Sequence, residues 1–167
     1  KRVDLIVEAM KHVPEDIPLL IAGTGPDEAR LKALAGGDKR IRFLGFVADN
    51  DMPALYADAL AVPFVPYDED YGLVTIEAMK SGKPVLTVPD SGGPCEFVRD
   101  GETGLVCGLS PAAIGAGLSR LADDVAATEA MGRKALDSMA AITWDPVAEG
   151  LLQRAGFALP VTDVDRI

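Results

Sequence analysis

The sequence predicts an α/β fold, with a Rossmann-like parallel sheet that carries helices on both faces. Short apolar runs alternate with amphipathic segments, their connections are short, and glycine or proline marks most of their ends. Regular alternation of strand and helix is typical of parallel sheets, because each crossover helix covers one face of the sheet. The 167 residues suffice for one domain with its own hydrophobic core.

Each element is assigned from the spacing of its apolar residues and from the glycine or proline that ends it. Apolar residues that recur every three or four positions indicate helices, and short apolar runs indicate strands. Pro26 and Pro111 fit the first turn of a helix, where no amide is needed, and Ser110 is the expected N-cap before Pro111. The predicted elements in chain order are helix 3–12, buried strand 18–23, helix 26–34, strand 41–45, helix 51–58, strand 60–65, helix 73–81, strand 84–88, a short helix from 94, strand 104–106 and mostly helical structure from 111.

The charge balance argues against some partners. Acidic residues outnumber basic ones by 26 to 16, which disfavours broad binding to nucleic acid or to an anionic membrane surface. A small anionic ligand stays compatible, held by local donors. No apolar stretch approaches the roughly 20 residues of a membrane span, and the amphipathic opening leads us to expect no secretory signal. Cys95 and Cys107 lack metal-ligand spacing, so we expect reduced thiols in a cytoplasmic protein.

The turns after the strands are predicted to form a binding crevice. In open parallel sheets ligands bind outside the carboxyl ends of the strands, where turns distant in sequence meet. Glycine is frequent in three of these turns, 23–26, 45–47 and 89–94, whereas the fourth, 66–72, is acidic.

The segment from Glu69 to Glu77 says most about chemistry. These two carboxylates lie eight positions apart and flank Gly72 at a predicted loop-to-helix junction. Unpaired amides of Gly72, Leu73 and Val74 could hold a diphosphate, and the carboxylates could accept hydrogen bonds from sugar and ribose hydroxyls. The alternative is that Glu77 is a solvated helix residue and Glu69 part of an acidic surface loop.

The same segment resembles the signature of glycosyltransferase family 4, a group of GT-B enzymes also described as glycosyl transferases group 1. That signature is Glu, seven residues that include Phe-Gly-Leu, and then Glu-Ala-Met-Ala-x-Gly-x-Pro-Val. Here it stands as Glu69, Tyr71-Gly72-Leu73 and the run from Glu77 to Val85. Other segments resemble further motifs of the family in the same order: Gly23-Thr24-Gly25-Pro26, Ile41 to Val47, Ser91 to Glu96, Asp100 to Leu105, and Trp144 at the start of a closing helix.

The resemblance implies a separate role for each matching residue. Glu69 would contact hydroxyls of the donor sugar and help set its pose in the transition state, and Glu77 would bind the ribose hydroxyls. The amides of Tyr71, Gly72 and Leu73 would meet the diphosphate.

Two further residues complete the implied site. Lys1 matches the lysine of the family's Gly-Arg-Leu…Lys-Gly stretch, which neutralises charge on the departing diphosphate, and Val47 would contact the nucleobase through its backbone. No cofactor and no metal are implied, because helix N-termini and basic side chains hold the diphosphate. The pair Asp123-Asp124 is therefore expected at a helix junction, and His12 and Trp144 in structural roles.

The chain also departs from the family pattern. Asp70 and Tyr71 stand where Pro-Phe is commoner, which keeps the ring but adds a charge beside the phosphates, and Lys80 replaces an alanine on a face expected to be exposed. The family's arginine upstream of Lys1, the first strand of the domain and the N-terminal acceptor-binding domain are not in this sequence. The chain is therefore expected to be a piece of something longer.

Together these motifs predict the donor-binding half of a GT-B enzyme, with a nucleotide-sugar-binding domain at 1–153 and a loosely held tail at 154–167. The full enzyme would be a retaining NDP-sugar-dependent glycosyltransferase that moves a hexosyl unit to an acceptor hydroxyl, in cell-surface polysaccharide or glycolipid synthesis. It would work in the cytoplasm or at the inner face of the membrane, without nucleic acid, and this piece alone would be inactive. Two alternatives stay open: a non-catalytic glycosyltransferase-like binding module, which the intact glutamate pair disfavours, and a GT-B nucleotide-sugar epimerase.

Overall fold

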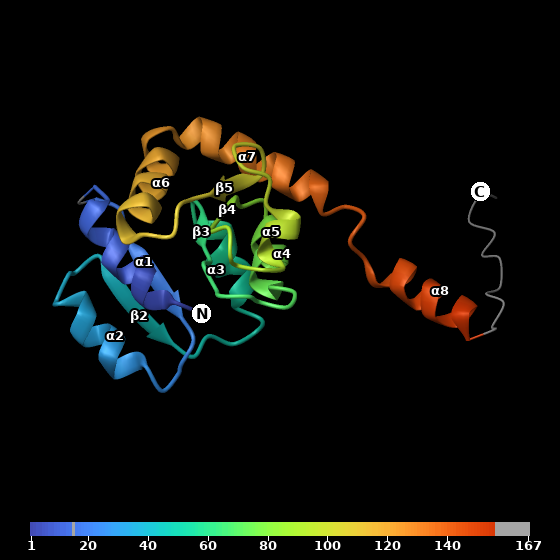
Figure 1. Cartoon of the computed structure of the whole chain (residues 1–167), viewed down its shortest axis with the longest axis horizontal. Coiled ribbons are helices and arrows are strands. Elements are labelled where there is room, and N and C mark those ends of the chain that lie inside the picture. Colours follow the sequence, from blue (N-terminus) through green and yellow to red (C-terminus); the bar gives the residue numbers. More distant parts are fainter. Residues whose placement is uncertain (15, 156–167) are drawn as a thin grey trace.

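The computed structural model describes residues 1–14 and 16–155 and confirms the predicted α/β class (Figure 1). Every helix and strand expected from the sequence is present within a few residues of its predicted bounds, and the first helix ends in a 3₁₀ turn, η1. The elements in chain order are α1 Val3–Ala9, η1 Met10–His12, β1 Leu19–Ala22, α2 Glu28–Ala35, β2 Ile41–Gly45, α3 Met52–Asp58, β3 Val62–Pro63, α4 Leu73–Lys80, β4 Val85–Thr87, α5 Pro94–Phe97, β5 Gly104–Val106, α6 Pro111–Asp123, α7 Val125–Ser138 and α8 Trp144–Arg154.

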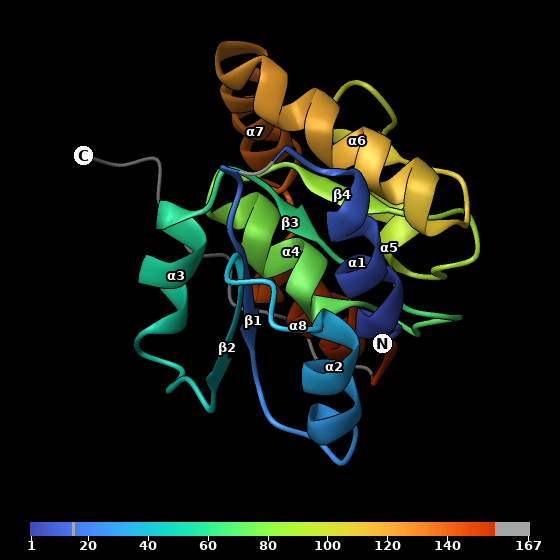
Figure 2. The same cartoon turned by 90° about the vertical axis from the view of Figure 1, so that its left-hand side faces the viewer.

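The strands form two parallel sheets. β1 pairs with β2, while β4 lies between β3 and β5. In Figure 2 the two groups lie apart, β1 with β2 and β3 with β4. A doubly wound sheet of order 3-2-1-4-5-6 would split into such a pair and triple without its strand 1. The topology therefore agrees with the expectation that the first strand of the domain is not in this sequence.

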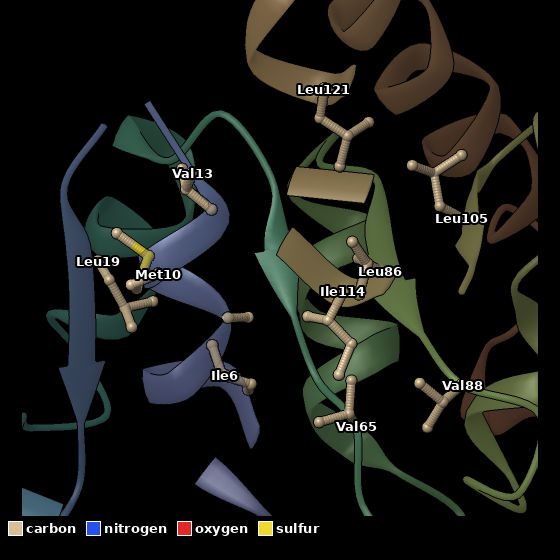
Figure 3. Packing of buried hydrophobic residues seen from close by; sticks show 11 residues of the cluster. Ile6, Met10, Val13, Leu19, Val65, Leu86, Val88, Leu105, Ile114 and Leu121 are labelled. Atoms are coloured by element: carbon tan, nitrogen blue, oxygen red, sulfur yellow. The ribbon is translucent and has the colours of Figure 1, made fainter. Parts of the chain in front are cut away.

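Helices cover both faces of the three-stranded sheet, and successive residues of β4 show it. Leu86 belongs to a buried cluster with residues of α1 and α6, whereas its neighbour Val85 belongs to a second cluster with residues of α3, α4 and α7. Figure 3 shows the first cluster, in which Ile114 of α6 lies beside Leu86 and Val65, and Ile6 of α1 lies on the side of Met10 and Leu19. Because side chains alternate across a strand, the two clusters lie on opposite faces of this sheet.

The strand expected to be buried at 18–23 is buried only in part, so that prediction was wrong in its burial. Leu19 is 8% exposed and packs in the first cluster, but Leu20 is 44% exposed. Among the described residues, β1 has one neighbouring strand, β2, and its second face is not covered. An apolar run typical of a central strand therefore lies half open to solvent.

The C-terminal third is helical, and its junctions follow the predicted capping. Ser110 Oγ accepts a hydrogen bond from the Ala113 amide (3.2 Å) at the start of α6. Asp124 accepts one from the Ala127 amide (2.9 Å), which confirms a helix junction between α6 and α7.

α8 stands away from the body in Figure 1. It begins at Trp144, whose side chain is outside those described, and ends at Arg154; the rest of the predicted tail, from residue 156, lies outside the described residues. None of the helices in the described part of the chain is both long and apolar enough to cross a membrane.

Candidate functional site

The acidic turn after β3 lies directly against the glycine turn after β4. The Glu69 amide donates to the Ser91 carbonyl (3.0 Å), and the Gly93 amide donates to the Glu69 carbonyl (2.7 Å). A Cβ on Gly92 would lie 2.6 Å from the Glu69 carbonyl oxygen, and one on Gly93 would lie 2.7 Å from that of Asp70. The two glycines therefore allow a backbone contact that fixes where Glu69 stands.

Lys1 and Glu69, 68 positions apart, meet at this place. The Lys1 ammonium donates to the Glu69 carboxylate in an ion pair, and it also lies 5.6 Å from the centre of the Phe64 ring. The Lys1 side chain stays 58% exposed and that of Glu69 25% exposed, so both remain within reach of a ligand. The structure thus joins two residues to which the family resemblance gave different roles, Glu69 at the sugar and Lys1 at the diphosphate.

Arg2 ties the start of α1 to the same edge. Its Nε donates to the Val65 carbonyl (2.8 Å), Nη2 donates to the Pro66 carbonyl, and the guanidinium forms a two-pronged pair with Asp90 (Nη1–Oδ2 3.0 Å, Nη2–Oδ1 2.8 Å). The hydrogen bonds from Arg2 hold the pKa of the Asp90 carboxyl below its usual range. The Arg2 side chain therefore links the start of α1, next to Lys1, to the ends of β3 and β4.

The backbone of Arg2 is left-handed, with φ 51° and ψ 40°. The family's stretch has glycine after its lysine, and glycine adopts this conformation without steric cost. Arg2 adopts this conformation although it is not glycine, and its side chain makes the contacts just described.

α4 follows the loop that carries Glu69 and begins with the expected unpaired amides. Gly72 is its N-cap at φ 72°, and a Cβ there would lie 2.8 Å from the Pro94 side chain. The Thr75 amide is taken by the Gly72 carbonyl (2.8 Å), but the amides of Gly72, Leu73 and Val74 have no acceptor among the described residues. Helix N-termini with such amides attract anions, so this end of α4 could hold a phosphate.

Glu77 is exposed and follows on the same helix. The Tyr56 hydroxyl, from α3, donates to Glu77 Oε2 at 2.9 Å. Burial, followed by the hydrogen bond to Glu77, raises the pKa of Tyr56 above its ordinary value. The Glu77 carboxylate therefore accepts a hydrogen bond from a neutral donor. Among the described residues it forms no ion pair with a lysine or arginine.

The remaining nominated residues, Tyr71 and Val47, lie on the loops that follow β3 and β2. Tyr71 is half exposed, with its ring edge-on to Phe97 at 5.5 Å between centroids. Val47 is partly buried two residues beyond β2, and that strand's end meets the end of β1 through a bond from the Gly23 amide to the Gly45 carbonyl (2.7 Å). Neither Val47 nor Glu77 is joined by a hydrogen bond or ion pair to Lys1 or Glu69 within the described chain.

Sequence reasoning missed three residues that shape the site: Arg2, Asp90 and Tyr56. Asp90 lies in the turn 89–94, which the sequence predicts to border the binding crevice. A carboxylate in that turn could have marked it as a site residue. Arg2 was detectable as a departure from glycine at its motif position. Nothing in the sequence pairs Tyr56 with a glutamate 21 positions later, because the pairing depends on how α3 packs beside α4.

Known proteins resemble this chain in sequence and in fold. The family model described as Glycosyl transferases group 1 matches residues 1–141. D-inositol 3-phosphate glycosyltransferase of Salinispora arenicola is 37% identical over 145 residues, which cover 83% of this chain and 32% of that protein. This chain spans about a third of the length of the curated relatives it matches.

Two solved structures share the fold. HepE of Anabaena, in complex with UDP and glucose, aligns with a TM-score of 0.81 at 22% identity, over 93% of this chain and 45% of that one. WaaG, a glycosyltransferase involved in lipopolysaccharide biosynthesis, aligns with a TM-score of 0.74 at 26% identity, over 93% of this chain and 42% of that one. Structural neighbours of this chain are thus GT-B glycosyltransferases, as the sequence resemblance implied.

Proposed function

Because this chain belongs to the glycosyl transferases group 1 family, we propose that it is the donor-binding part of an NDP-sugar-dependent glycosyltransferase. The observation that carries the proposal is the meeting of Lys1 and Glu69 beside the free N-terminal amides of α4. A nucleotide sugar needs a cation and amides for its diphosphate and a carboxylate for its sugar hydroxyls, and this edge of the sheet carries all of these groups.

The diphosphate would lie against the start of α4. The amides of Tyr71, Gly72 and Leu73 lie at the loop-to-helix junction. The helix dipole would stabilise a phosphate bound there. Lys1 would leave Glu69 and turn to the phosphates when the donor binds, and Glu69 would then accept hydrogen bonds from the sugar. Glu77 would take the ribose hydroxyls and Val47 the nucleobase. The complex of HepE with UDP and glucose supports a uridine nucleotide as the first donor to try.

In the reaction, the bond between the anomeric carbon and the diphosphate oxygen breaks, and its electron pair goes to the diphosphate. The acceptor hydroxyl oxygen forms the new bond to the same carbon, and its proton passes to the departing diphosphate. Charge grows on the departing diphosphate, so pre-placed amides and the Lys1 ammonium stabilise the transition state more than the ground state. No metal enters this scheme, because the cation and the helix terminus neutralise the leaving group.

The finer assignment follows the same resemblance. We place the protein in glycosyltransferase family 4, with retention of configuration and a hexosyl donor. The likeness to WaaG, which is involved in lipopolysaccharide biosynthesis, supports a role in cell-surface polysaccharide or glycolipid synthesis. The acceptor would bind to a part of the protein outside this chain, and closure of the two parts would orient donor and acceptor. This piece alone is expected to bind nucleotide weakly and to transfer nothing.

Turnover of UDP- and GDP-hexoses by the full-length protein tests the proposal. Release of nucleoside diphosphate that requires an acceptor is the expected result. Glu69→Gln should lower kcat by about 10²-fold, in the range seen when one transition-state contact is lost, whereas Glu129→Gln, an exposed glutamate of α7, should leave it unchanged. Epimerised nucleotide sugar formed without acceptor would favour the epimerase, and no turnover of any donor would favour the non-catalytic module.

A further inference from the structure

Tyr56 is a buried side chain with its polar end in the candidate site. The residue is 7% exposed and packs in the cluster that contains Ile76 and Met79 of α4. Its hydroxyl emerges from this cluster and donates to Glu77 Oε2 at 2.9 Å. Within the described residues no other side chain donates to the Glu77 carboxylate; the Ser81 hydroxyl donates to the Glu77 backbone carbonyl (2.8 Å).

We propose that Tyr56 is a positioning residue that fixes the Glu77 carboxylate for recognition of the ribose diol. This inference rests on the proposed function, since it assigns to Tyr56 the orientation of a group that the donor would contact. Tyr56 touches neither the sugar nor the phosphates in this scheme, and it acts only through Glu77.

The packing explains why Tyr56 can do this. Glu77 is an exposed residue with three rotatable bonds, so without a partner its carboxylate would sample many positions. The Tyr56 ring is held by core contacts, and its hydroxyl therefore stands at one place. A fixed donor selects one rotamer of Glu77, and a preorganised acceptor binds a diol more tightly than a mobile one.

The chemistry of the donor suits the role. A phenol contributes one hydrogen bond and no charge, so Oε1 and the second lone pair of Oε2 stay available for two hydroxyls. A lysine or arginine at this place would neutralise Glu77 and compete with the ribose. The raised pKa of Tyr56, caused first by burial and then by Glu77, keeps the phenol protonated at working pH.

The test compares ribose and deoxyribose ligands on the full-length protein. Calorimetric titration would give the ratio of Kd values for 2′-deoxy-UDP and UDP, and for the guanine pair, in the wild type and in Tyr56→Phe. Phenylalanine keeps the buried ring and removes only the hydroxyl. Thr128→Val is the control, because it removes another buried hydroxyl, bonded to the Leu121 carbonyl (2.7 Å), away from the crevice.

The expected result is a ratio that favours the ribonucleotide in the wild type and falls about three- to tenfold in Tyr56→Phe, with a matching fall in Glu77→Gln. Thr128→Val should lower Tm without moving the ratio. A ratio that falls in Glu77→Gln but stays within about twofold of the wild type in Tyr56→Phe would overturn the inference and leave the proposed function intact. A wild type with no saturable binding would instead overturn the proposed function, and the inference with it.

Discussion

The two sheets of this domain are built from similar apolar runs but differ in burial. All three residues of β4 are fully buried between two helical layers, whereas β1 keeps Leu20 44% exposed. The turns after β3 and β4 are tied by backbone hydrogen bonds and by Arg2, and they carry Glu69. The turns after β1 and β2, where Val47 lies, share one backbone hydrogen bond, from Gly23 to Gly45. Glu69, proposed for the chemistry, thus stands on a turn of the more buried sheet, and Val47, proposed for the base, stands beyond the more exposed one.

This difference separates two tasks. Stabilising a leaving diphosphate requires groups that are already in place, because electrostatic stabilisation depends on preorganisation. Contact with a nucleobase tolerates more adjustment, because it changes little between ground and transition states. We therefore expect substitutions in the three-stranded sheet to cost more stability than matched ones in the two-stranded sheet.

The largest difference is expected for one leucine in each sheet. Leu86→Ala removes a side chain that is fully buried in β4 and should destabilise the protein by about 3 kcal/mol or more, from lost burial plus a cavity. Leu20→Ala in β1 should cost about 1 kcal/mol or less, since that side chain is largely exposed. Urea unfolding of the full-length protein measures both, and equal losses would contradict the contrast between the sheets.

Arg2 tests how the site depends on the link between α1 and the three-stranded sheet. Arg2→Ala should lower donor turnover about tenfold, because Lys1 and the turn that carries Glu69 lose their anchor. Arg2→Gly should lose the same contacts but unfold at higher temperature than Arg2→Ala, since glycine relieves the left-handed backbone by about 1 kcal/mol. Arg30→Ala, an exposed arginine of α2, is the control. Turnover like the wild type in both Arg2 variants would show that Lys1 needs no anchor.

Lowering the pH is expected to have a smaller effect on stability. It should destabilise the protein through one carboxylate beside each sheet. The pKa of Asp90 is lowered by Arg2, and the pKa of Asp38, before β2, is lowered by Arg40. A carboxyl with a lowered folded pKa stabilises the protein above about pH 4, its unfolded value, and loses that contribution as pH falls through the folded value.

The Tm difference between the wild type and Asp90→Asn should therefore be constant from pH 5 to 7 and shrink below about pH 4. Asp38→Asn should show the same window, but only Asp90→Asn should also lower donor turnover at pH 7. If the Tm difference between the wild type and either variant grew as the pH was lowered, the ion pairs with Arg2 and Arg40 would not stabilise the protein as described.

The smallest effect is expected inside β4 itself. Thr87 is fully buried, and its hydroxyl has no partner among the described residues. Thr87→Val should change stability by no more than about 0.5 kcal/mol, or raise it, because no hydrogen bond is lost. Thr128→Val should cost about 1 kcal/mol, since its hydroxyl donates to the Leu121 carbonyl. A clear loss in Thr87→Val would point to a partner for that hydroxyl.

Much of the fold was predictable because its signals are local. Periodicity, prolines in first turns and the Ser110 cap placed the elements, and strand–helix alternation gave the parallel topology. The burial of β1 was not predictable, since an apolar run such as Leu19 to Ala22 does not record how many neighbours it will have. Strand register and the covering of each sheet face depend on tertiary contacts, and these contacts set the burial of β1.

The site divides in the same way. Glu69, Gly72 and Glu77 were recognisable because one continuous segment carries them. Lys1 was nominated from a motif rather than from spacing, but its ion pair with Glu69 was not predicted and is seen only in the structure. Arg2 and Tyr56 act through side chains that reach other elements, and such contacts leave no periodic trace in the sequence.

The central claim is that the two glutamates have separate partners, the sugar for Glu69 and the ribose for Glu77. Calorimetric titration of the full-length protein with UDP and GDP, which carry no sugar, tests it most directly. We predict saturable binding of one nucleotide, weakened about tenfold by Glu77→Gln and left within about threefold of the wild type by Glu69→Gln. Equal weakening by both substitutions, or none by Glu77→Gln, would contradict the assignment.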